Sequence, residues 1–407
     1  MRLAAAGACL TTKHSQSRQA RVCARQISLP PESIPSMSTP IEKMRNIAII
    51  AHVDHGKTTL VDELLKQSGT FRENEKTAER MMDSNDLEKE RGITILAKTT
   101  SVEWKDYRIN IVDTPGHADF GGEVERILQM VDGAIVLVDA AEGPMPQTKF
   151  VVSKALKVGL RPIVAVNKID KPERRPDEVI NEVFDLFANL DASDDQLDFP
   201  ILYGSAKQGW MNIEYENQTE NMDSLFQMVV DHVPVPKVEE GPFRFLATTI
   251  SSDPFLGRIL TGRVSSGTIK PNQSIKVLNR DGELVEQTRV SKVLAFRGLD
   301  RVPVDEAQAG DIVSLAGTTK ANVADTFCDP SVSEPIEAQP IDPPTISMTF
   351  RVNDSPLAGT EGTKVTSRMI WDRLLKETSI PAWSCRNCPS ARPTCWTCAR
   401  RVWAVPA

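Results

Sequence analysis

A short polar stretch carries a glycine, a lysine and a threonine in succession, Gly56-Lys57-Thr58, and this order suits the binding of a phosphate group. Backbone N–H groups at the start of a helix attract anions, the Lys57 ammonium adds a positive charge, and the Thr58 hydroxyl can ligate Mg²⁺. The usual pattern begins with a glycine, whereas Ala51 stands at that position here. A small residue there still permits a tight exit from a strand. The stretch predicts a nucleoside triphosphate site, but an isolated match is weak and leaves the base open.

Two further stretches predict contacts around the γ-phosphate. In Asp113-Thr-Pro-Gly116, the carboxylate of Asp113 can hold Mg²⁺ through a water, and the Gly116 N–H can bond a γ-phosphate. Thr94, in the polar stretch of residues 86–95, can complete the Mg²⁺ shell and contact the same phosphate. Loss of the phosphate would release that stretch, which would make it a conformational switch.

The base is predicted by Asn167-Lys-Ile-Asp170 and by Gly204-Ser-Ala-Lys207. Asp170 can accept hydrogen bonds from N1–H and the 2-amino group of guanine, which adenine cannot offer. Asn167 can reach N7 of the base or tie its loop to the phosphate loop. A backbone N–H of residues 204–207 would close over O6. These motifs in this order specify GTP over ATP and make coincidence a weak explanation.

His117 directly follows Gly116, at a position where many small GTPases place a glutamine that orients the attacking water. An imidazole can do the same and responds to its surroundings. We therefore expect His117 to be catalytic and to position the water only when a partner docks. For His52 and His55 the sequence favours loop scaffolding over catalysis.

Three acidic features are interpreted without a catalytic role. Asp132 and Asp139 flank an apolar run and are predicted to be turn or sheet-end residues. The acidic run of residues 191–198 is predicted to be a solvated loop.

The elements that must position these residues alternate between apolar runs and amphipathic stretches. Such alternation predicts an α/β domain with a mostly parallel sheet and helices on both faces, in which 99–113 forms an antiparallel edge hairpin. Strands are expected at 47–51, 99–104, 107–113, 133–139, 162–167 and 200–203, and helices at 121–131, 146–158 and 176–190.

Composition divides the chain into further segments. The predicted GTPase domain covers residues 44–236 and is followed by a proline-containing linker. Short runs separated by turn signals predict a small β-barrel over 243–335, with strands at 243–250, 258–264, 273–277 and 311–315. Residues 341–377 are expected to begin a third, α/β domain with a strand at 346–352 and a helix at 367–377.

Residues 1–43 resemble an organelle transit peptide, because basic residues occur up to Pro31 without any acidic residue. We expect a mitochondrial or plastid location if this segment targets, and a cytoplasmic one otherwise; the composition does not separate the two organelles. A disordered extension, or a start that precedes the native Met37 or Met44, is the alternative.

Residues 378–407 contain no Asp, Glu or Lys, and we interpret them as a non-native tail from an aberrant reading frame or splice product. The alternative is a zinc knuckle formed by the tail's cysteines, although their two pairs are closely spaced for one. That set is Cys385, Cys388, Cys395 and Cys398.

The bulk composition excludes several classes of protein. In the 407 residues no run of about 18 apolar residues occurs, so we expect no membrane span. The net charge of −7 argues against a broadly basic nucleic-acid surface, and we expect a monomer that does not bind DNA. Cysteines are missing between Cys23 and Cys328, which fits a reducing compartment.

Beyond these motifs, the chain resembles the translational GTPases. Arg91-Gly-Ile-Thr94 and Asp113-Thr-Pro-Gly-His117 are typical of that class. Within it, residues 45–57, 120–126, 143–148 and 187–200 resemble the BipA/TypA family, and the last range discriminates best. The resemblance extends from about residue 44 to residue 377.

This resemblance implies a GTPase that is stimulated by ribosomes, contacts rRNA and ribosomal proteins, and acts in large-subunit assembly and translation under stress. It implies that Thr58 and Thr94 hold Mg²⁺, that His117 activates hydrolysis, and that 243–335 is domain II. It also implies a phosphate cradle of Asp54, His55, Gly56, Lys57, Thr58 and Thr59, and a guanine site of Asn167, Lys168, Asp170, Ser205, Ala206 and Lys207. Family members continue beyond the third domain's first strand and helix, so a GTP-binding remnant without ribosome-dependent activity is the alternative.

Overall fold

The computed structural model describes residues 39–69, 94, 96–115, 121–253, 255–338, 352, 356, 359–360 and 366–377. The expected strand at 346–352 falls almost entirely outside this described part, and the cysteine-rich tail does so completely. In the described ranges, no helix is both long and apolar enough to cross a membrane.

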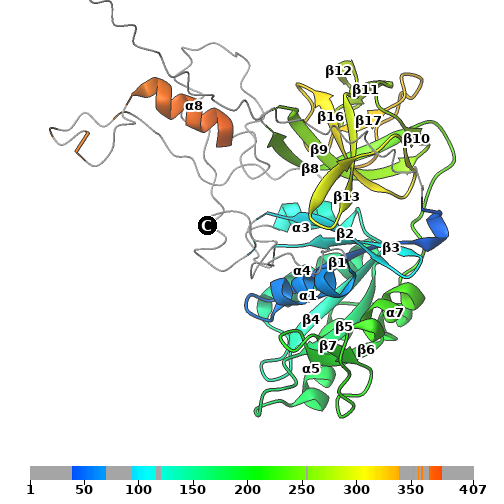
Figure 1. Ribbon diagram of the computed structural model, residues 1–407, viewed down its shortest axis with the longest axis vertical. Coiled ribbons are helices and arrows are strands. Elements are labelled where there is room, and N and C mark those ends of the chain that lie inside the picture. Colours follow the sequence, from blue (N-terminus) through cyan, green and yellow to red (C-terminus); the bar gives the residue numbers. More distant parts are fainter. Residues whose placement is uncertain are drawn as a thin grey trace, which may run out of the picture. The chain divides into compact units, whose positions relative to one another are not determined.

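Residues 44–212 form a seven-stranded sheet in the order β2-β3-β1-β4-β5-β6-β7 (Figure 1). Strands β3, β1, β4, β5 and β6 are parallel, whereas β2 and β7 pair antiparallel at the two edges. Every residue of β1 and β4 is buried, as expected for strands covered on both faces. The strands are β1 (Met44–Ala51), β2 (Lys98–Trp104), β3 (Tyr107–Asp113), β4 (Gly133–Asp139), β5 (Arg161–Asn167), β6 (Ile201–Ser205) and β7 (Trp210–Asn212).

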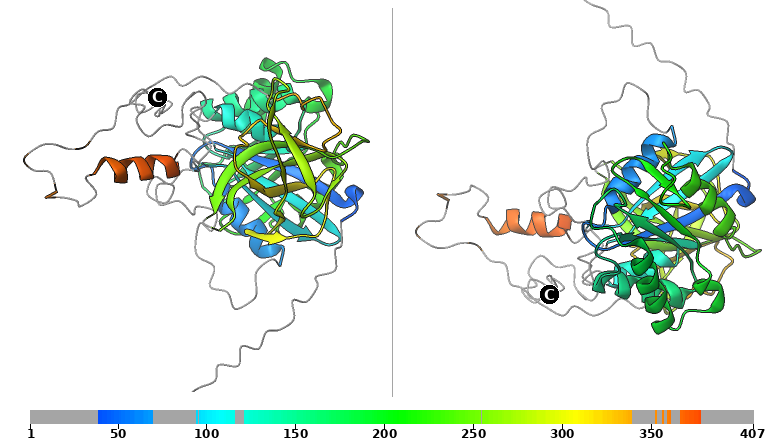
Figure 2. Two further views of the ribbon diagram at one scale, coloured as in Figure 1. Left: turned by 90° about the horizontal axis from the view of Figure 1, so that it is seen from above. Right: turned by 90° about the horizontal axis from the view of Figure 1, so that it is seen from below.

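Helices cover both faces of this sheet (Figure 2). Leu64 of α1 and Phe226 of α7 belong to the core on one face. Val124 of α3, Val152 of α4 and Phe187 of α5 belong to the core on the other. The predicted α/β architecture is therefore confirmed. The helices are the short 3₁₀ helix η1 (Ile41–Lys43), α1 (Lys57–Gln67), α3 (Gly121–Leu128), α4 (Pro146–Val158), α5 (Pro176–Asn189), α6 (Asp194–Leu197) and α7 (Asp223–His232).

The acidic run differs from the solvated loop that was predicted, because its middle forms α6. Gln196 is buried, and its amide donates to the carbonyls of Leu156 (3.1 Å) and Leu160 (3.0 Å). Its side-chain oxygen accepts the Ser193 N–H at 3.1 Å. The prediction was wrong here because one uncharged residue anchors the segment to α4. The helix expected at 121–131 also ends earlier, at Leu128.

Residues 244–328 form the small barrel that was predicted. An eight-stranded sheet, β12-β11-β17-β8-β9-β16-β13-β14, curls until Thr288 Oγ1 of the end strand β12 donates to the Gly317 carbonyl of β16 at 3.2 Å. Phe245 and Phe327 meet edge to face in its core. The strands are β8 (Arg244–Asp253), β9 (Gly257–Ser266), β10 (Thr268–Ile269), β11 (Ser274–Leu278), β12 (Leu284–Arg289), β13 (Lys292–Arg297), β14 (Asp300–Pro303), β15 (Ala307–Gln308), β16 (Ile312–Thr318) and β17 (Thr326–Cys328).

Polar contacts join the barrel to the first domain. Gly298, in the β13–β14 turn, exchanges backbone hydrogen bonds with Ser101 of the edge strand β2. Asn46 of β1 donates to Asp132 (3.1 Å) and to the Gly310 carbonyl (3.0 Å). The contact of Gly298 with Ser101 covers the β2 edge of the sheet, and the bond from Asn46 to Gly310 ties the barrel to the central strand β1. Beyond the barrel, α8 (Ser367–Glu377) coincides with the helix expected there.

Candidate nucleotide-binding site

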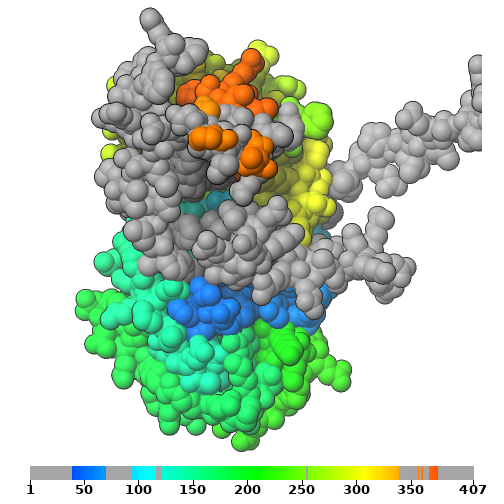
Figure 3. All heavy atoms as spheres, turned by 90° about the vertical axis from the view of Figure 1, so that its left-hand side faces the viewer, coloured from blue at the N-terminus to red at the C-terminus, as the bar shows by residue number. Residues whose placement is uncertain are grey.

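The turn between β1 and α1 has the geometry of an anion-binding loop. Asp54 and Gly56 adopt left-handed conformations, with φ of 65° and 94°. Gly56 occupies the N-cap position and has no side chain to bond the first-turn N–H groups, so those groups can face an anion. A Cβ on Gly56 would lie 2.5 Å from Asn167 Nδ2, so glycine is required here. Residues 39–69, which include this turn, are the blue surface in Figure 3.

Three predicted site residues from separate segments meet beside this turn. The Lys57 ammonium lies 2.5 Å from Asp113 Oδ1 and donates to Thr94 Oγ1 at 2.9 Å. Thr94 Oγ1 lies 3.4 Å from Asp113 Oδ2. All three residues are buried. Asp113 ends β3 and Lys57 begins α1, so the sheet brings the phosphate-loop cation to the strand-end carboxylate.

The oxygen atoms in this cluster fit a hard divalent cation. Mg²⁺ prefers carboxylate and hydroxyl oxygens together with phosphate and water. Asp113 and Thr94 present such oxygens side by side, and Thr58 follows Lys57 in the first turn of α1. Thr58, Thr94 and, through water, Asp113 are the residues expected to hold the metal, and this assignment stays a prediction.

The guanine loop is tied to the phosphate loop by Asn167. Its Nδ2 donates to the His55 carbonyl at 2.8 Å, and its Oδ1 accepts the Ala206 N–H at 2.8 Å. Two roles were expected for Asn167, a contact with N7 of the base or a link between its loop and the phosphate loop. The structure shows the link between the loops. Three loops that are far apart in sequence are therefore held together by one amide side chain.

The remaining base-binding candidates lie at the same edge of the sheet. Lys168 donates to the Asp54 carbonyl at 2.6 Å, while Asp170 is exposed and available to a base. Ser205 ends β6 and is buried; Lys207 is exposed. Because β1, β4, β5 and β6 are parallel, the loops after their carboxyl ends all meet at one edge, as in other open α/β sheets.

His55 is buried within the phosphate loop, with no exposed side-chain surface, and its Nε2 lies 3.3 Å from Glu142 Oε2. Burial and the nearby His52 lower the pKa of His55, and the charges of Asp139 and Glu142 act against this shift without reversing it. The neutral imidazole packs as part of the loop, in agreement with the expected scaffold role.

Asp139 is a residue whose position the sequence did not reveal. It was interpreted as a sheet-end residue, and it does end β4, but its carboxylate lies 2.6 Å from the Lys168 ammonium. The signal in the sequence was an acidic residue at the end of an otherwise uncharged, apolar run.

Two predicted residues lie outside the described residues: the catalytic candidate His117 and the γ-phosphate sensor Gly116. The predicted switch stretch, residues 86–95, is described only at Thr94.

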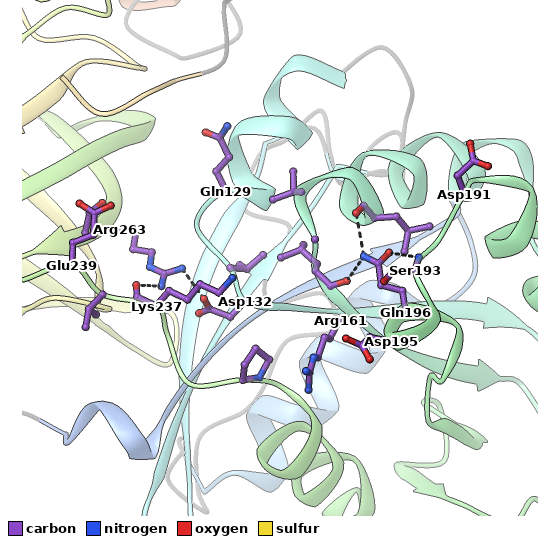
Figure 4. Close-up of a pocket in the computed structure, with 18 residues that line it drawn as sticks. Gln129, Asp132, Arg161, Asp191, Ser193, Asp195, Gln196, Lys237, Glu239 and Arg263 are labelled. Carbon is purple, nitrogen blue, oxygen red and sulfur yellow. Dashed lines mark hydrogen bonds and ion pairs between the residues drawn. The ribbon is translucent and has the colours of Figure 1, made fainter. Parts of the chain in front are cut away.

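A cavity of about 820 Å³ lies away from the nucleotide loops (Figure 4). It is lined by Asp132 before β4, Arg161 at the start of β5, and Lys237 and Arg263 from the linker and the barrel. The strands begin there, whereas the nucleotide loops follow their carboxyl ends. The cavity is therefore no part of the nucleotide site.

Comparison with known proteins identifies the class. A family model described as "Elongation factor Tu GTP binding domain" matches residues 42–235, and one described as "Elongation factor Tu domain 2" matches residues 257–328. These ranges correspond to the α/β domain and to most of the barrel. The chain is a GTP-binding protein with the domain arrangement of translational GTPases.

The particular family follows from curated relatives named "Large ribosomal subunit assembly factor BipA". The relative from Escherichia coli (strain K12) is 56% identical over 338 residues, which are 83% of this chain and 56% of the relative. The relative from Haemophilus influenzae is 56% identical over 339 residues, which are 83% of this chain and 55% of the relative. The chain belongs to the BipA/TypA family of translational GTPases, and it spans about half the length of these relatives.

A solved structure from Thermus thermophilus has the same fold. It superposes with a TM-score of 0.63 at 17% identity, over 83% of this chain and 61% of that chain. At this identity the likeness concerns the fold alone.

Proposed function

We propose that this protein is a molecular switch that binds and hydrolyses GTP and acts on ribosomes, in assembly of the large subunit and in translation under stress. The cluster of Lys57, Asp113 and Thr94, joined through Asn167 to the guanine loop, carries the nucleotide part of the proposal. The ribosomal part is supported by the name shared by the BipA relatives.

In this mechanism the phosphate loop holds GTP by its backbone N–H groups and by Lys57. The ammonium exchanges its contact with Asp113 for the β- and γ-phosphates. It neutralises the charge that develops on the departing GDP as the bond between the γ-phosphorus and the β–γ bridging oxygen breaks. Mg²⁺, held by Thr58, Thr94 and, through water, Asp113, supplies further charge neutralisation when it is bound.

Hydrolysis requires a water in line with the γ-phosphate. We assign its orientation to His117, aligned by the ribosome, and we assign detection of the γ-phosphate to Gly116 and Thr94. After hydrolysis Thr94 loses its phosphate contact, and the switch stretch of residues 86–95 is released together with the partner.

Single-turnover GTP hydrolysis, with and without ribosomes, tests this proposal. We expect ribosomes to accelerate hydrolysis and a His117→Ala variant to lose about a hundredfold of the accelerated rate. A His117→Ala protein with full stimulation would remove His117 from catalysis. A wild-type protein that binds GTP but gains no rate from ribosomes would be the binding remnant instead of the switch.

We also propose that residues 1–43 direct the protein to an organelle. We propose separately that the protein acts as a monomer. Fusion of this segment to a fluorescent reporter tests the location. Import into mitochondria or plastids is the expected result, and a cytoplasmic reporter would contradict it.

A further inference from the structure

The buried carboxylate at the end of β4 contacts the guanine loop. Asp139 has no exposed side-chain surface; its Oδ2 lies 2.6 Å from Lys168 Nζ and 3.5 Å from Lys171 Nζ. Its Oδ1 accepts the Ala141 N–H at 2.8 Å. Burial acts to raise the pKa of Asp139, but the bonds from Lys168 and Ala141 outweigh it and the pKa is lowered. The carboxylate is therefore charged at neutral pH.

Lys168 links Asp139 to the phosphate loop by contacting both. Its ammonium donates to the Asp54 carbonyl at 2.6 Å while it is held by Asp139. Lys168 and Asp54 both have left-handed backbones, with φ of 62° and 65°. Residues other than glycine keep this conformation only where surrounding contacts enforce it. The Asp139–Lys168–Asp54 chain provides such a contact at both strained positions.

The loop after Asp139 is itself fixed. Ala140 N donates to the Asn167 carbonyl at 2.8 Å, and Arg175, the residue before α5, donates through Nε to the Ala141 carbonyl at 2.9 Å. Arg175 is in turn paired with Glu182. The carboxylate is thus presented from a rigid support and not from a mobile side chain on the surface.

We propose that Asp139 is a positioning residue for the nucleotide site: it holds Lys168 and so sets the register between the guanine loop and the phosphate loop. Asp139 does not touch the nucleotide in this account. It acts on Asp170, two residues beyond Lys168, by fixing the backbone from which Asp170 reaches the base. The inference rests on the proposed GTP-binding function.

The test compares the full chain with an Asp139→Asn variant, which keeps the shape and the acceptor for the Ala141 N–H. We expect dissociation of GDP to be about tenfold faster, because one partner of a buried charge pair is lost. We also expect a smaller preference for GDP over inosine diphosphate, which lacks the 2-amino group that Asp170 recognises. A purely structural role would leave this preference unchanged.

Two further variants make the result specific. Lys171→Ala removes only the more distant and more exposed ammonium and should leave both quantities close to wild type. In a Lys168→Met background, Asp139→Asn should add little further loss, because the two residues act as one unit. Thermal unfolding of each variant confirms that it is folded.

The outcomes separate this inference from the proposed function. The positioning role is wrong if the wild-type protein binds GDP but Asp139→Asn changes neither the dissociation rate of GDP nor the base preference. It is also wrong if Asp139→Asn has its full effect in the Lys168→Met background. If the wild-type protein binds no guanine nucleotide, the proposed function itself fails.

Discussion

Lys57 has two roles that can be separated by experiment. In the structure it neutralises the wholly buried carboxylate of Asp113, and in the proposed mechanism it binds the phosphates of GTP. A buried ion pair is weak evidence for stability, but removal of one partner leaves an unpaired charge at a high cost. Removal of Lys57 is therefore expected to lower both stability and nucleotide binding.

The Lys57→Met variant should be less stable by about 3 kcal/mol, because Asp113 is left unpaired. A Lys57→Met/Asp113→Asn double variant should recover most of that loss and still bind GTP poorly. Urea unfolding and equilibrium nucleotide binding measure the two effects. Recovery of GTP binding in the double variant would show that Lys57 does not contact the phosphates.

The buried His55 predicts a dependence of stability on pH. Its folded pKa lies below the usual value near 6.5, so the unfolded chain binds more protons than the folded chain as pH falls below 6.5. The contribution of His55 to stability is complete above pH 6.5. It is lost as the pH falls toward the lower pKa of the folded state, by at most about 1.4 kcal/mol per pH unit. His232, whose pKa is lowered by burial and by Arg161, acts in the same direction.

Denaturant unfolding between pH 7.5 and pH 5.5 tests this, with the range chosen to span the usual histidine pKa of about 6.5. We expect the free energy of unfolding to decrease as the pH is lowered. Both His55→Gln and His232→Gln should make this dependence on pH less steep. An equally steep slope in the His55→Gln variant would rule out its contribution.

At the scale of elements, the nucleotide loops follow carboxyl ends of parallel strands and are joined by side chains from one loop to the next. Gly56 and Asn167 approach each other closely, and this approach requires both a left-handed backbone at Gly56 and the absence of a Cβ. This packing explains why a loop with so few side-chain contacts of its own is held in one shape.

Gly56→Ala is therefore expected to abolish tight GTP binding, because the new Cβ would displace Asn167 and open the contact between the loops. Gly159→Ala is the matched control, since Gly159 ends α4 with φ of 84° but has open space around it. The control should lose about 1 kcal/mol of stability and keep its nucleotide affinity. Equal affinities in the two variants would contradict the packing argument.

The nucleotide loops and the long helices could be predicted from sequence because their signals are local: a loop motif with an apolar run before it, or helical periodicity over several turns. Strands as short as β10 and β15 carry too few residues for a pattern, and they form because distant segments pair. The position of Asp139 beside Lys168 likewise depends on two adjacent parallel strands, which no local pattern specifies. Asn46 and Gly310 are an extreme case, since they are 264 positions apart.

At the scale of the whole molecule, the barrel is fixed to the GTP-binding domain by buried polar contacts. Asp132 pairs with Arg263 of β9 at 2.9 Å and accepts from Asn46 of β1. Arg108 of β3 forms an ion pair with Asp311. Such contacts are directional, so they define one arrangement of the two domains instead of a sliding interface.

Arg263→Met should lower the free energy of unfolding by about 2 kcal/mol, because Asp132 stays buried with one partner fewer. Arg244→Met is the control: it breaks an ion pair with the largely exposed Glu239 and should cost about 0.5 kcal/mol or less. Urea unfolding of the full chain measures both, and equal losses would show that the interface pair does not hold the domains together.

The most direct test of the account is the base specificity of the nucleotide site in the wild-type chain and in Asp170→Asn. We expect the wild type to bind GDP at least about a hundredfold more tightly than ADP or xanthosine diphosphate, because only guanine offers both donors to the Asp170 carboxylate. The variant should transfer its preference to xanthosine diphosphate, whose 2-oxo group accepts from the new amide. A wild-type protein that binds ADP as well as GDP, or an Asp170→Asn protein that still prefers GDP, would contradict the assignment of this site.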